Sequence, residues 1–385
     1  MARLGDICTI VSGSTPKSNI PEYWDGDIKW ITPAELDQGT YIINDSVRHI
    51  TELGVAKTGL KPFPQGTVIL SSRAPIGKTA IAGCEMYCNQ GFKNMICSEK
   101  INPRYLYWFL TCNTEYLNSL GRGATFKEIS KEIVANIEIP LPAIEQQITI
   151  AEKFEKISEL ISLRKEQLAK LDQLVKSRFI ELFGDPEENT KQWTVRPLGE
   201  LCSVGSSKRI YQNEQSFEGI PFWRISDLVS KMDTGTADSD LYIPAEKYSE
   251  LKQAGLVPVA GDIFVTSRGT LGRCYIIKAE DCFYFQDGMI SWLSKYSDEI
   301  TPLYLQYLFT MSGFRKQIDS MQAGSTVAYL SIAMLKKLQT MVPSRDAQEQ
   351  FATFVEQTDK SKLAIQQILD KLELLKKSLM QEYFG

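Results

Sequence analysis

The sequence has 385 residues, 43% of them hydrophobic, and a formal net charge of −4. This length allows two or three domains with packed cores, and no apolar run approaches the ~20 residues needed to span a bilayer. The slight negative charge argues against a protein that coats nucleic acid through bulk positive charge, although a local basic patch could still bind it.

Cysteine and histidine usage restricts the possible chemistry. The eight cysteines form no Cys-x-x-Cys pair, and His49 is the only histidine. A single histidine argues against a mixed Cys/His zinc site and against a hydrolase that uses histidine as its base. We expect reduced, mostly buried thiols and no metal. The start, MARLGDICTI, lacks the charged head and apolar stretch of a signal peptide, so we expect a cytoplasmic protein with no membrane partner.

The first segment, residues 1–142, is rich in short β-type runs such as TVILSS and NMICS, and in Gly, Pro and aromatic residues. One helix is expected inside it, beginning at Pro103 with Asn102 as its cap, because proline suits the first helical position. No regular alternation of strands and helices appears, so antiparallel or mixed sheets and an α+β fold are expected.

The second segment, residues 143–184, predicts one long helix. It contains no glycine or proline between positions 144 and 183, and its apolar residues recur with the 4-3 spacing of a coiled-coil seam. The residues of this seam are Ile150, Phe154, Ile157, Ile161, Leu168, Leu171, Val175 and Leu182. A helix of about 40 residues would be ~60 Å long.

Residues 185–197 form a linker, after which the pattern returns. Residues 198–343 repeat the β-rich segment, with a helix expected at Pro302 capped by Thr301, and residues 344–385 repeat the long helix. The opening RLGDICTIVSG returns as PLGELCSVGSS, and the helix end KSRFIELFG returns as KSLMQEYFG. The same order in both halves indicates a duplication.

The two long helices have complementary gaps in their seams. Arg164 and Arg178 of the first match Ile365 and Leu379 of the second, and Lys362 and Lys376 match Ile161 and Val175. Neither seam is complete alone, so we expect the two helices to pair with each other in antiparallel orientation.

The motif SSRAPIGKT at 71–79 resembles a nucleotide-binding loop, except that Ser72 stands where such a loop has glycine. Its second copy, TSRGTLGRC, keeps the Ser-Arg pair (Ser267, Arg268) but replaces Lys-Thr by Arg-Cys. A phosphate loop cannot lose both the lysine and the magnesium-binding hydroxyl. The motif therefore predicts a strand followed by an arginine on a tight turn. Such an arginine suits a phosphate or a base edge, or is paired with a nearby carboxylate.

A catalytic centre is not predicted. NPRY at 102–105 resembles the Asn-Pro-Pro-Tyr tetrapeptide of adenine methyltransferases but lacks the second proline, and a helix cap explains it. No glycine-rich loop follows a strand with an acidic residue about 20 positions on, as a dinucleotide or S-adenosylmethionine site requires.

Taken together, the motifs resemble the specificity subunit of type I restriction–modification enzymes. The resemblance covers essentially the whole chain and recurs in both halves. It rests on SGSTPKS, WITPAEL, SSRAPIGK, CNQGF, GATFKEIS and IPLPAIEQQ, and on the helix ends ELFGDP and EYFG.

This resemblance implies two pseudo-repeated target recognition domains, residues 1–142 and 198–343, that each read one half of a split, asymmetric target in double-stranded DNA. It implies that the two antiparallel helices form a coiled-coil spacer, whose ~60 Å length limits the target to about 18 base pairs. Two methyltransferase subunits would dock on the helices, and two motor-nuclease subunits could join. The subunit itself would be no enzyme and hold no cofactor. Its partners would methylate adenine N6 with S-adenosylmethionine and use ATP and Mg²⁺ for nuclease work.

DNA contacts are predicted from the repeat and the resemblance together. The predicted contact residues of the first copy are Ser14, Thr15, Lys17, Ser72, Arg73, Lys78, Thr125, Phe126 and Lys127. Those of the second copy are Lys208, Arg209, Tyr211, Ser267, Arg268, Arg273 and Thr326. Arginines should supply most guanine discrimination.

Some assignments stay open at this stage. Gln90 and Gln286 either belong to hairpin turns or reach adenine, and Trp30 and Trp223 either pack in cores or stack on bases. The competing function is a duplicated scaffold that joins partners without reading DNA. About equal numbers of acids and bases in residues 1–142 favour the scaffold, and the paired Ser-Arg turns count against it.

Overall fold

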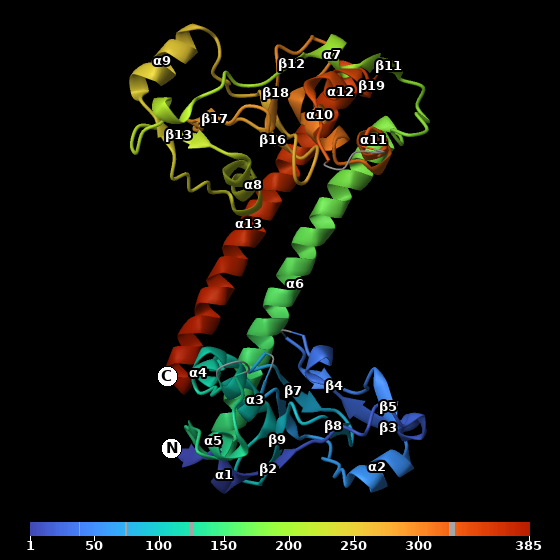
Figure 1. The fold of residues 1–385 in the computed structure, drawn as a ribbon, viewed down its shortest axis with the longest axis vertical. Helices are drawn as coiled ribbons and strands as arrows, with labels where there is room; N and C mark the ends of the chain where they lie inside the picture. Colours follow the sequence, from blue (N-terminus) through green and yellow to red (C-terminus); the bar gives the residue numbers. More distant parts are fainter. Residues whose placement is uncertain (38, 74, 124–126, 323–327) are drawn as a thin grey trace. The chain divides into compact units, whose positions relative to one another are not determined.

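The computed structural model describes residues 1–37, 39–73, 75–123, 127–322 and 328–385. The chain forms two compact units, the first made of Met1–Glu166 with Gln366–Gly385 and the second of Gln167–Ile365. Both ends of the chain therefore belong to the first unit (Figure 1).

The first unit contains three sheets. Its strands are β1 (Ala2–Arg3), β2 (Cys8–Ser12), β3 (Trp24–Ile31), β4 (Ile42–Ile43), β5 (Arg48–Ile50), β6 (Val68–Leu70), β7 (Thr79–Ala82), β8 (Tyr87–Cys88), β9 (Lys93–Cys97) and β10 (Glu138–Ile139). They pair in the orders β2-β9-β6-β7-β4, β5-β3-β8 and β1-β10. The β4–β7 and β3–β8 pairs are parallel and the others are antiparallel. All residues of β6 and β7 are buried, as expected for the centre of a sheet covered on both faces.

The second unit repeats this arrangement. Its strands are β11 (Thr194–Pro197), β12 (Ser203–Gly205), β13 (Ile220–Trp223), β14 (Tyr242–Ile243), β15 (Ile263–Thr266), β16 (Cys274–Ile276), β17 (Tyr284–Phe285), β18 (Ile290–Ser294) and β19 (Gln339–Val342). They pair in the orders β12-β18-β15-β16, β14-β13-β17 and β11-β19. Each sheet has a counterpart in the first unit, where β4 adds a fifth strand.

Helices cover these sheets. The helices of the first unit are α1 (Leu4–Ile7), α2 (Glu52–Thr58), α3 (Pro103–Cys112), α4 (Thr114–Ser119) and α5 (Lys131–Ala135). Those of the second are α7 (Leu198–Leu201), α8 (Ile225–Thr234), α9 (Ala245–Gln253), α10 (Pro302–Leu308), α11 (Ser312–Ser320) and α12 (Ile332–Lys337). Short 3₁₀ helices span Pro21–Tyr23, Pro33–Glu35 and Gln212–Glu214. As predicted, Asn102 Oδ1 accepts from Arg104 N at 2.9 Å to cap α3, and Thr301 Oγ1 accepts from Tyr304 N at 3.3 Å to cap α10.

The two long helices are α6 (Ile144–Phe183) and α13 (Arg345–Phe384), close to the predicted bounds. They pair in antiparallel orientation within each unit. In the first, the rings of Phe154 and Phe384 stack 5.5 Å apart. In the second, Phe179 meets Phe351 edge-on at 5.5 Å, and Lys362, one of the seam gaps, binds Asp172 at 2.6 Å. The predicted stop of α6 is confirmed by Gly184, which has φ +80° and whose N–H donates to Ile180 O.

Two expectations are corrected. The prediction of one helix inside each β-rich segment is wrong, because each segment contains several further helices. The longest of these, α8, has 10 residues, too few for a sustained apolar period. The predicted linker 185–197 ends in a strand, because Thr194–Pro197 pairs with β19 from Thr194↔Val342 to Pro197↔Gln339.

Candidate nucleic-acid interface

The Ser-Arg motif of each copy forms a tight turn between two antiparallel strands, β6 and β7 in the first copy and β15 and β16 in the second. We call residues 71–78 and 266–273 the arginine turns; Ala74 lies outside the described residues. In the first turn Ser71 N donates to Lys78 O at 2.8 Å, and in the second Thr266 N donates to Arg273 O at 2.9 Å. The same bond closes both turns, so Ser71 and Lys78 of the first copy correspond to Thr266 and Arg273 of the second.

A hydroxyl group holds each turn from inside. Ser71 Oγ donates to Pro75 O at 2.7 Å and accepts from Lys78 N at 2.9 Å. Thr266 Oγ1 likewise donates to Thr270 O and accepts from Arg273 N at 3.0 Å. Sequence reasoning missed these two residues, although the hydroxyl retained in both copies was a usable signal.

The turns are not nucleotide-binding loops. A phosphate loop places its lysine and hydroxyl at the start of a helix. Here Thr79 begins the buried strand β7 instead. Lys78 Nζ donates to Pro33 O at 3.0 Å, which ties the turn to the segment after β3. This lysine therefore has a structural partner within the chain.

Each turn depends on a glycine. Gly77 has φ +99° and Gly272 has φ +72°, a region that side chains disfavour. A Cβ at Gly77 would lie 2.8 Å from Thr114 Cγ2, and one at Gly272 would lie 2.8 Å from Ile318 Cδ1. The shared glycine thus lets the turn pack closely on the helical layer.

The serines of the motif are buried. Ser72 Oγ accepts from the buried Lys93 Nζ at 3.2 Å, and that ammonium also binds Glu128 Oε1 at 3.1 Å. Ser267 Oγ bonds Ser291 Oγ at 2.8 Å. We therefore place Ser72 and Ser267 under the arginines as supports, not as groups that contact a ligand directly.

The arginines themselves remain available. Neither Arg73 nor Arg268 forms an ion pair with any residue in the described part of the chain. Arg268 is exposed, with its guanidinium 5.3 Å from the ring centroid of Tyr329. Arg73 is half-buried, and its Nε lies near Gly91. The alternative of a turn arginine held by a carboxylate thus does not apply to these two.

That alternative does apply to Arg273. Its guanidinium binds Asp233 Oδ1 at 2.5 Å, and this hydrogen bond lowers the pKa of the Asp233 carboxyl. Asp233 belongs to α8, so Arg273 ties its turn to a neighbouring segment as Lys78 does in the first copy.

Other predicted residues of the first copy meet beside the turn. Ser72 N donates to Gly91 O at 2.8 Å, which joins the turn to the loop after β8. From the loop after β2, Ser14 N donates to Cys88 O at 3.0 Å, and Thr15 Oγ1 donates to Gln90 Oε1. The structure therefore brings Thr15, Gln90 and Arg73 to one end of the five-stranded sheet.

The second copy has the same arrangement with different chemistry. Ser267 N donates to Met289 O at 2.9 Å. Arg209 Nε binds Asp287 Oδ2 at 2.8 Å, which raises the pKa of that guanidinium. An ion pair thus replaces the Thr15–Gln90 bond. Gln286 N donates to Trp223 O at 2.9 Å, and its side chain is half-buried.

The remaining predicted residues lie around these clusters. Lys17, Lys127, Lys208 and Tyr211 are exposed, and Lys208 N donates to Tyr284 OH at 2.9 Å. Thr125, Phe126 and Thr326 lie outside the described residues. None of these assignments as a DNA contact is tested, so they stay predictions.

The two tryptophans belong to cores. Trp30 is 2% exposed and its Nε1 donates to Ser14 O at 3.0 Å. Trp223 is 6% exposed and stacks on Phe283 with ring centroids 3.6 Å apart. Base stacking by either ring, left open by the sequence, is ruled out in this conformation.

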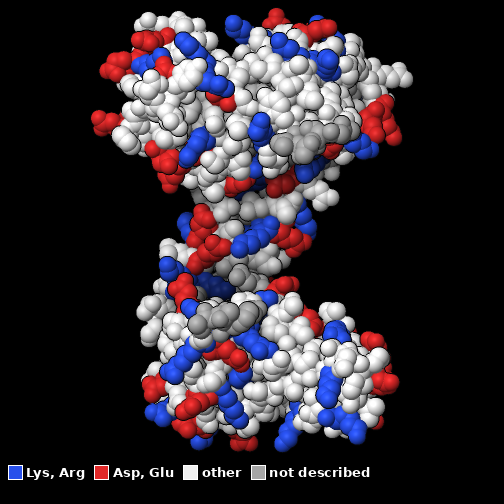
Figure 2. Space-filling view, in the orientation of Figure 1, with Lys and Arg blue, Asp and Glu red and all other residues white. Residues whose placement is uncertain are grey.

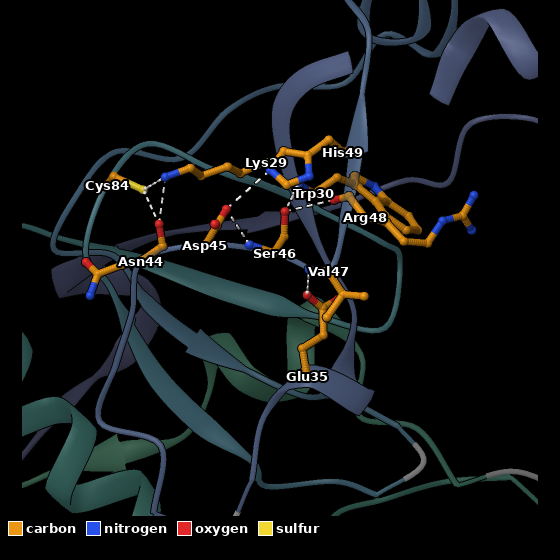
Figure 3. A network of polar contacts seen from close by, with 10 residues as sticks. All are labelled: Lys29, Trp30, Glu35, Asn44, Asp45, Ser46, Val47, Arg48, His49 and Cys84. Atoms are coloured by element: carbon orange, nitrogen blue, oxygen red, sulfur yellow. Dashed lines mark hydrogen bonds and ion pairs between the residues drawn. The ribbon is translucent and has the colours of Figure 1, made fainter. Parts of the chain in front are cut away.

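A polar network fixes the segment beside β3 in the first copy (Figure 3). Glu35 accepts from Val47 N at 2.7 Å, and Ser46 Oγ accepts from Trp30 N at 3.0 Å. Ser46 Oγ also donates to Arg48 O at 2.8 Å, while the Arg48 guanidinium lies 3.6 Å from the ring centroid of Trp24. Sequence reasoning did not single out this exposed cation.

On the face that Figure 2 shows, Lys and Arg are interspersed with Asp and Glu. Within the described part of the chain, no helix is long and apolar enough to cross a membrane.

The fold is duplicated, and each copy carries one arginine turn with a different polar pair beside it, Thr15–Gln90 in the first and Arg209–Asp287 in the second. A family model described as "Type I restriction modification DNA specificity domain" matches residues 1–173 and again residues 190–374. The chain therefore belongs to this family and carries two copies of its domain.

Proteins of this family are similar to the chain in sequence and in structure. The type I restriction enzyme MjaIX specificity subunit of Methanocaldococcus jannaschii is 30% identical over 377 residues, covering 92% of this chain and 85% of that protein. A putative type I restriction enzyme specificity subunit of Haemophilus influenzae is 27% identical over 288 residues, covering 74% and 67%. The solved type I restriction–modification S subunit from M. genitalium has a TM-score of 0.57 at 17% identity and covers 100% of this chain and 95% of its own. The comparisons give no support to the scaffold alternative.

Proposed function

We propose that this chain is the non-catalytic subunit that selects the DNA target of a type I restriction–modification complex, with each copy of the domain reading one half of a bipartite sequence. The observation that carries this proposal is the pair of arginine turns, whose arginines (Arg73 and Arg268) have no ion-pair partner in the described part of the chain. An unpaired guanidinium at a strand end is suited to the bidentate recognition of guanine.

The two half-sites should differ in sequence. The first cluster offers the neutral Thr15–Gln90 pair and the second the charged Arg209–Asp287 pair. An amide and a carboxylate present different donors and acceptors to base edges. The two clusters therefore favour different bases, and the target is asymmetric.

The complex supplies the chemistry that this chain lacks. We infer that two methyltransferase subunits dock on it and methylate adenine N6 with S-adenosylmethionine. Two motor-nuclease subunits that use ATP and Mg²⁺ can join them, and the assembly works in the cytoplasm. These finer points rest on the family resemblance.

The test compares Arg73→Ala with Arg268→Ala. Each variant complex would be assayed for methylation of a duplex library that varies one half-site at a time. We expect each variant to lose discrimination at a single half-site by about 1–3 kcal/mol per lost contact, and the two variants to affect opposite halves. An unchanged preference in both would remove the arginine turns from the reader.

Binding to random-sequence duplexes, with the methyltransferase partner present, separates this function from that of a scaffold. A scaffold would show no sequence preference in this competition. A reader should retain selected duplexes with a common two-part sequence.

A further inference from the structure

A groove of about 940 Å³ opens in the first unit. Its floor is the face of α3 that carries Tyr107 and Trp108, one wall is the first half of α6, and Tyr41 and Lys376 close its sides. None of its lining residues belongs to the arginine turn or its neighbouring loops. It is therefore separate from the nucleic-acid interface.

Hydrogen-bond donors in this groove lack acceptors. Trp108 Nε1, Thr111 Oγ1 and Ser158 Oγ are buried and have no hydrogen-bond partner among the residues that the structure describes. Trp108 is 95% buried as a whole residue, since its exposed fraction is 5%. Native proteins pair nearly all such groups, so three of them lining one groove indicate a place for an external acceptor.

A cation lies beside them. Lys376 is half-buried, with its Nζ 5.0 Å from the ring centroid of Trp108. Within the described ranges it has no ion pair, whereas nearby Lys165 is paired with Glu373 at 3.1 Å. Partial burial lowers the pKa of this ammonium, with Cys112, Lys165 and Glu373 as the charged or titratable groups near it. The groove thus gathers three neutral donors and the Lys376 ammonium.

The acidic side chains of the groove lie along α6, and two of them are already engaged. Glu155 accepts from both Tyr41 OH and Arg104, and Glu159 binds Lys156 at 3.0 Å. Glu152 is exposed at the rim. Because Glu155 and Glu159 already have partners, their carboxylates do not satisfy the unpaired donors of the groove.

The second unit serves as an internal comparison. In the first unit, the side chain of Gln147 on α6 accepts a hydrogen bond from Asn102 N at 2.8 Å. In the second unit, the side chain of Gln348 on α13 accepts one from Thr301 N at 2.8 Å. This correspondence aligns α6 with α13 and α3 with α10. At equivalent positions of the repeat, Tyr307 corresponds to Trp108, Asp359 to Ser158, and Val175 to Lys376.

In the second unit those positions hold no buried hydrogen-bond donor that lacks a partner within the described residues. The ring of Tyr307 meets Phe351 edge-on at 5.1 Å, and Val175 is 1% exposed. Asp359 binds Lys362 at 3.7 Å. The donor-rich groove is therefore a property of the first copy and not a by-product of the shared fold.

We propose that this groove binds a carboxylate side chain, carried on an apolar segment of the methyltransferase subunit that docks on the first copy. A carboxylate offers two acceptor oxygens to the indole N–H, the hydroxyls and the ammonium, and the surrounding rings receive the apolar segment. A groove of this size exceeds a lone small anion and fits a side chain with its neighbours. This inference rests on the proposed function, and it adds that the two methyltransferase subunits bind unequally.

Calorimetric titration of the full chain with the purified methyltransferase subunit tests this directly. For the wild-type chain we expect two binding steps of different affinity. Lys376→Met should weaken one step roughly thirtyfold, the loss typical of one partner of a desolvated charge pair. Trp108→Phe keeps an aromatic ring, although a smaller one, and removes the indole N–H; it should weaken the same step about fivefold. Tyr307→Phe in the second copy is the matched control and should change neither step.

Each outcome has a definite meaning. If Lys376→Met and Trp108→Phe chains unfold at the wild-type temperature and leave both steps unchanged, the groove is not the docking site. Equal weakening of both steps would also overturn the inference. If the wild-type chain binds no methyltransferase subunit, the proposed function itself fails, which is a different result from an unaltered variant.

Discussion

Gly77→Ala should damage the first arginine turn through two separable effects. With φ +99°, an alanine here adopts a left-handed conformation that costs about 1–2 kcal/mol. Its Cβ would also lie 2.8 Å from Thr114 Cγ2, well inside the ~3.5–4.0 Å of a favourable carbon contact. Overpacking of this kind costs about 1–3 kcal/mol. The free energy of unfolding of the first unit should therefore fall by about 2–5 kcal/mol.

The two effects can be separated by further variants. Thr114→Ser removes the obstructing methyl group, and the next atom, Thr114 Cβ, is an ordinary 3.5 Å away. The double variant Gly77→Ala/Thr114→Ser should thus recover the overpacking part. Gly59→Ala is the matched control, because Gly59 has φ +65° and no neighbour within 4 Å of the added Cβ.

The assay is urea unfolding combined with hydrogen exchange of the β6 and β7 amides. Exchange is needed because a chain with two compact units need not unfold in one transition. Gly77→Ala should also weaken recognition of the first half-site alone, since Arg73 lies on the same turn. The reasoning is refuted if Gly77→Ala destabilises no more than Gly59→Ala, or if Thr114→Ser restores nothing.

Two further variants test the supports of the fold. Ser72→Ala removes an acceptor from the buried Lys93 ammonium and should lower the free energy of unfolding by about 1.5–3 kcal/mol. Half-site preference in methylation assays should stay unchanged. A changed preference would mean that Ser72 contacts DNA. Burial raises the pKa of Glu155, but hydrogen bonds from Arg104 and Tyr41 outweigh it and leave the pKa below its usual range. The stabilisation from Glu155 is therefore present at neutral pH and is lost as the pH falls below about 4. Urea midpoints of Glu155→Gln should lie below wild type at pH 7, and the gap should narrow as the pH is lowered toward 3. An equal gap at both pH values would contradict this.

Patterns that extend over many residues were predictable from the sequence. The α6 and α13 seams hold one apolar period over several heptads, so their bounds came out within about a residue. The duplication placed Arg73 and Arg268 on equivalent turns because both copies keep the Ser-Arg pair and the glycine. The helix caps Asn102 and Thr301 followed from local chemistry alone.

Features that depend on tertiary contacts were not predictable. Ser72 and Ser267 look like candidate contacts in the sequence, but their burial is set by Lys93 and Ser291, which belong to other strands. The pairing of β11 with β19 joins segments far apart in the chain, so the linker composition hid a strand. Helices such as α5, with five residues, are too short to show a period.

Mapping modified adenines in DNA from cells that express this chain with its methyltransferase partner tests the central claim most directly. The account predicts one asymmetric two-part motif with an unread gap, and in cells carrying Arg268→Ala a motif relaxed in one part only. Modification without a common motif, or a motif whose two parts relax together in that variant, would contradict a chain that reads each half-site with its own arginine turn.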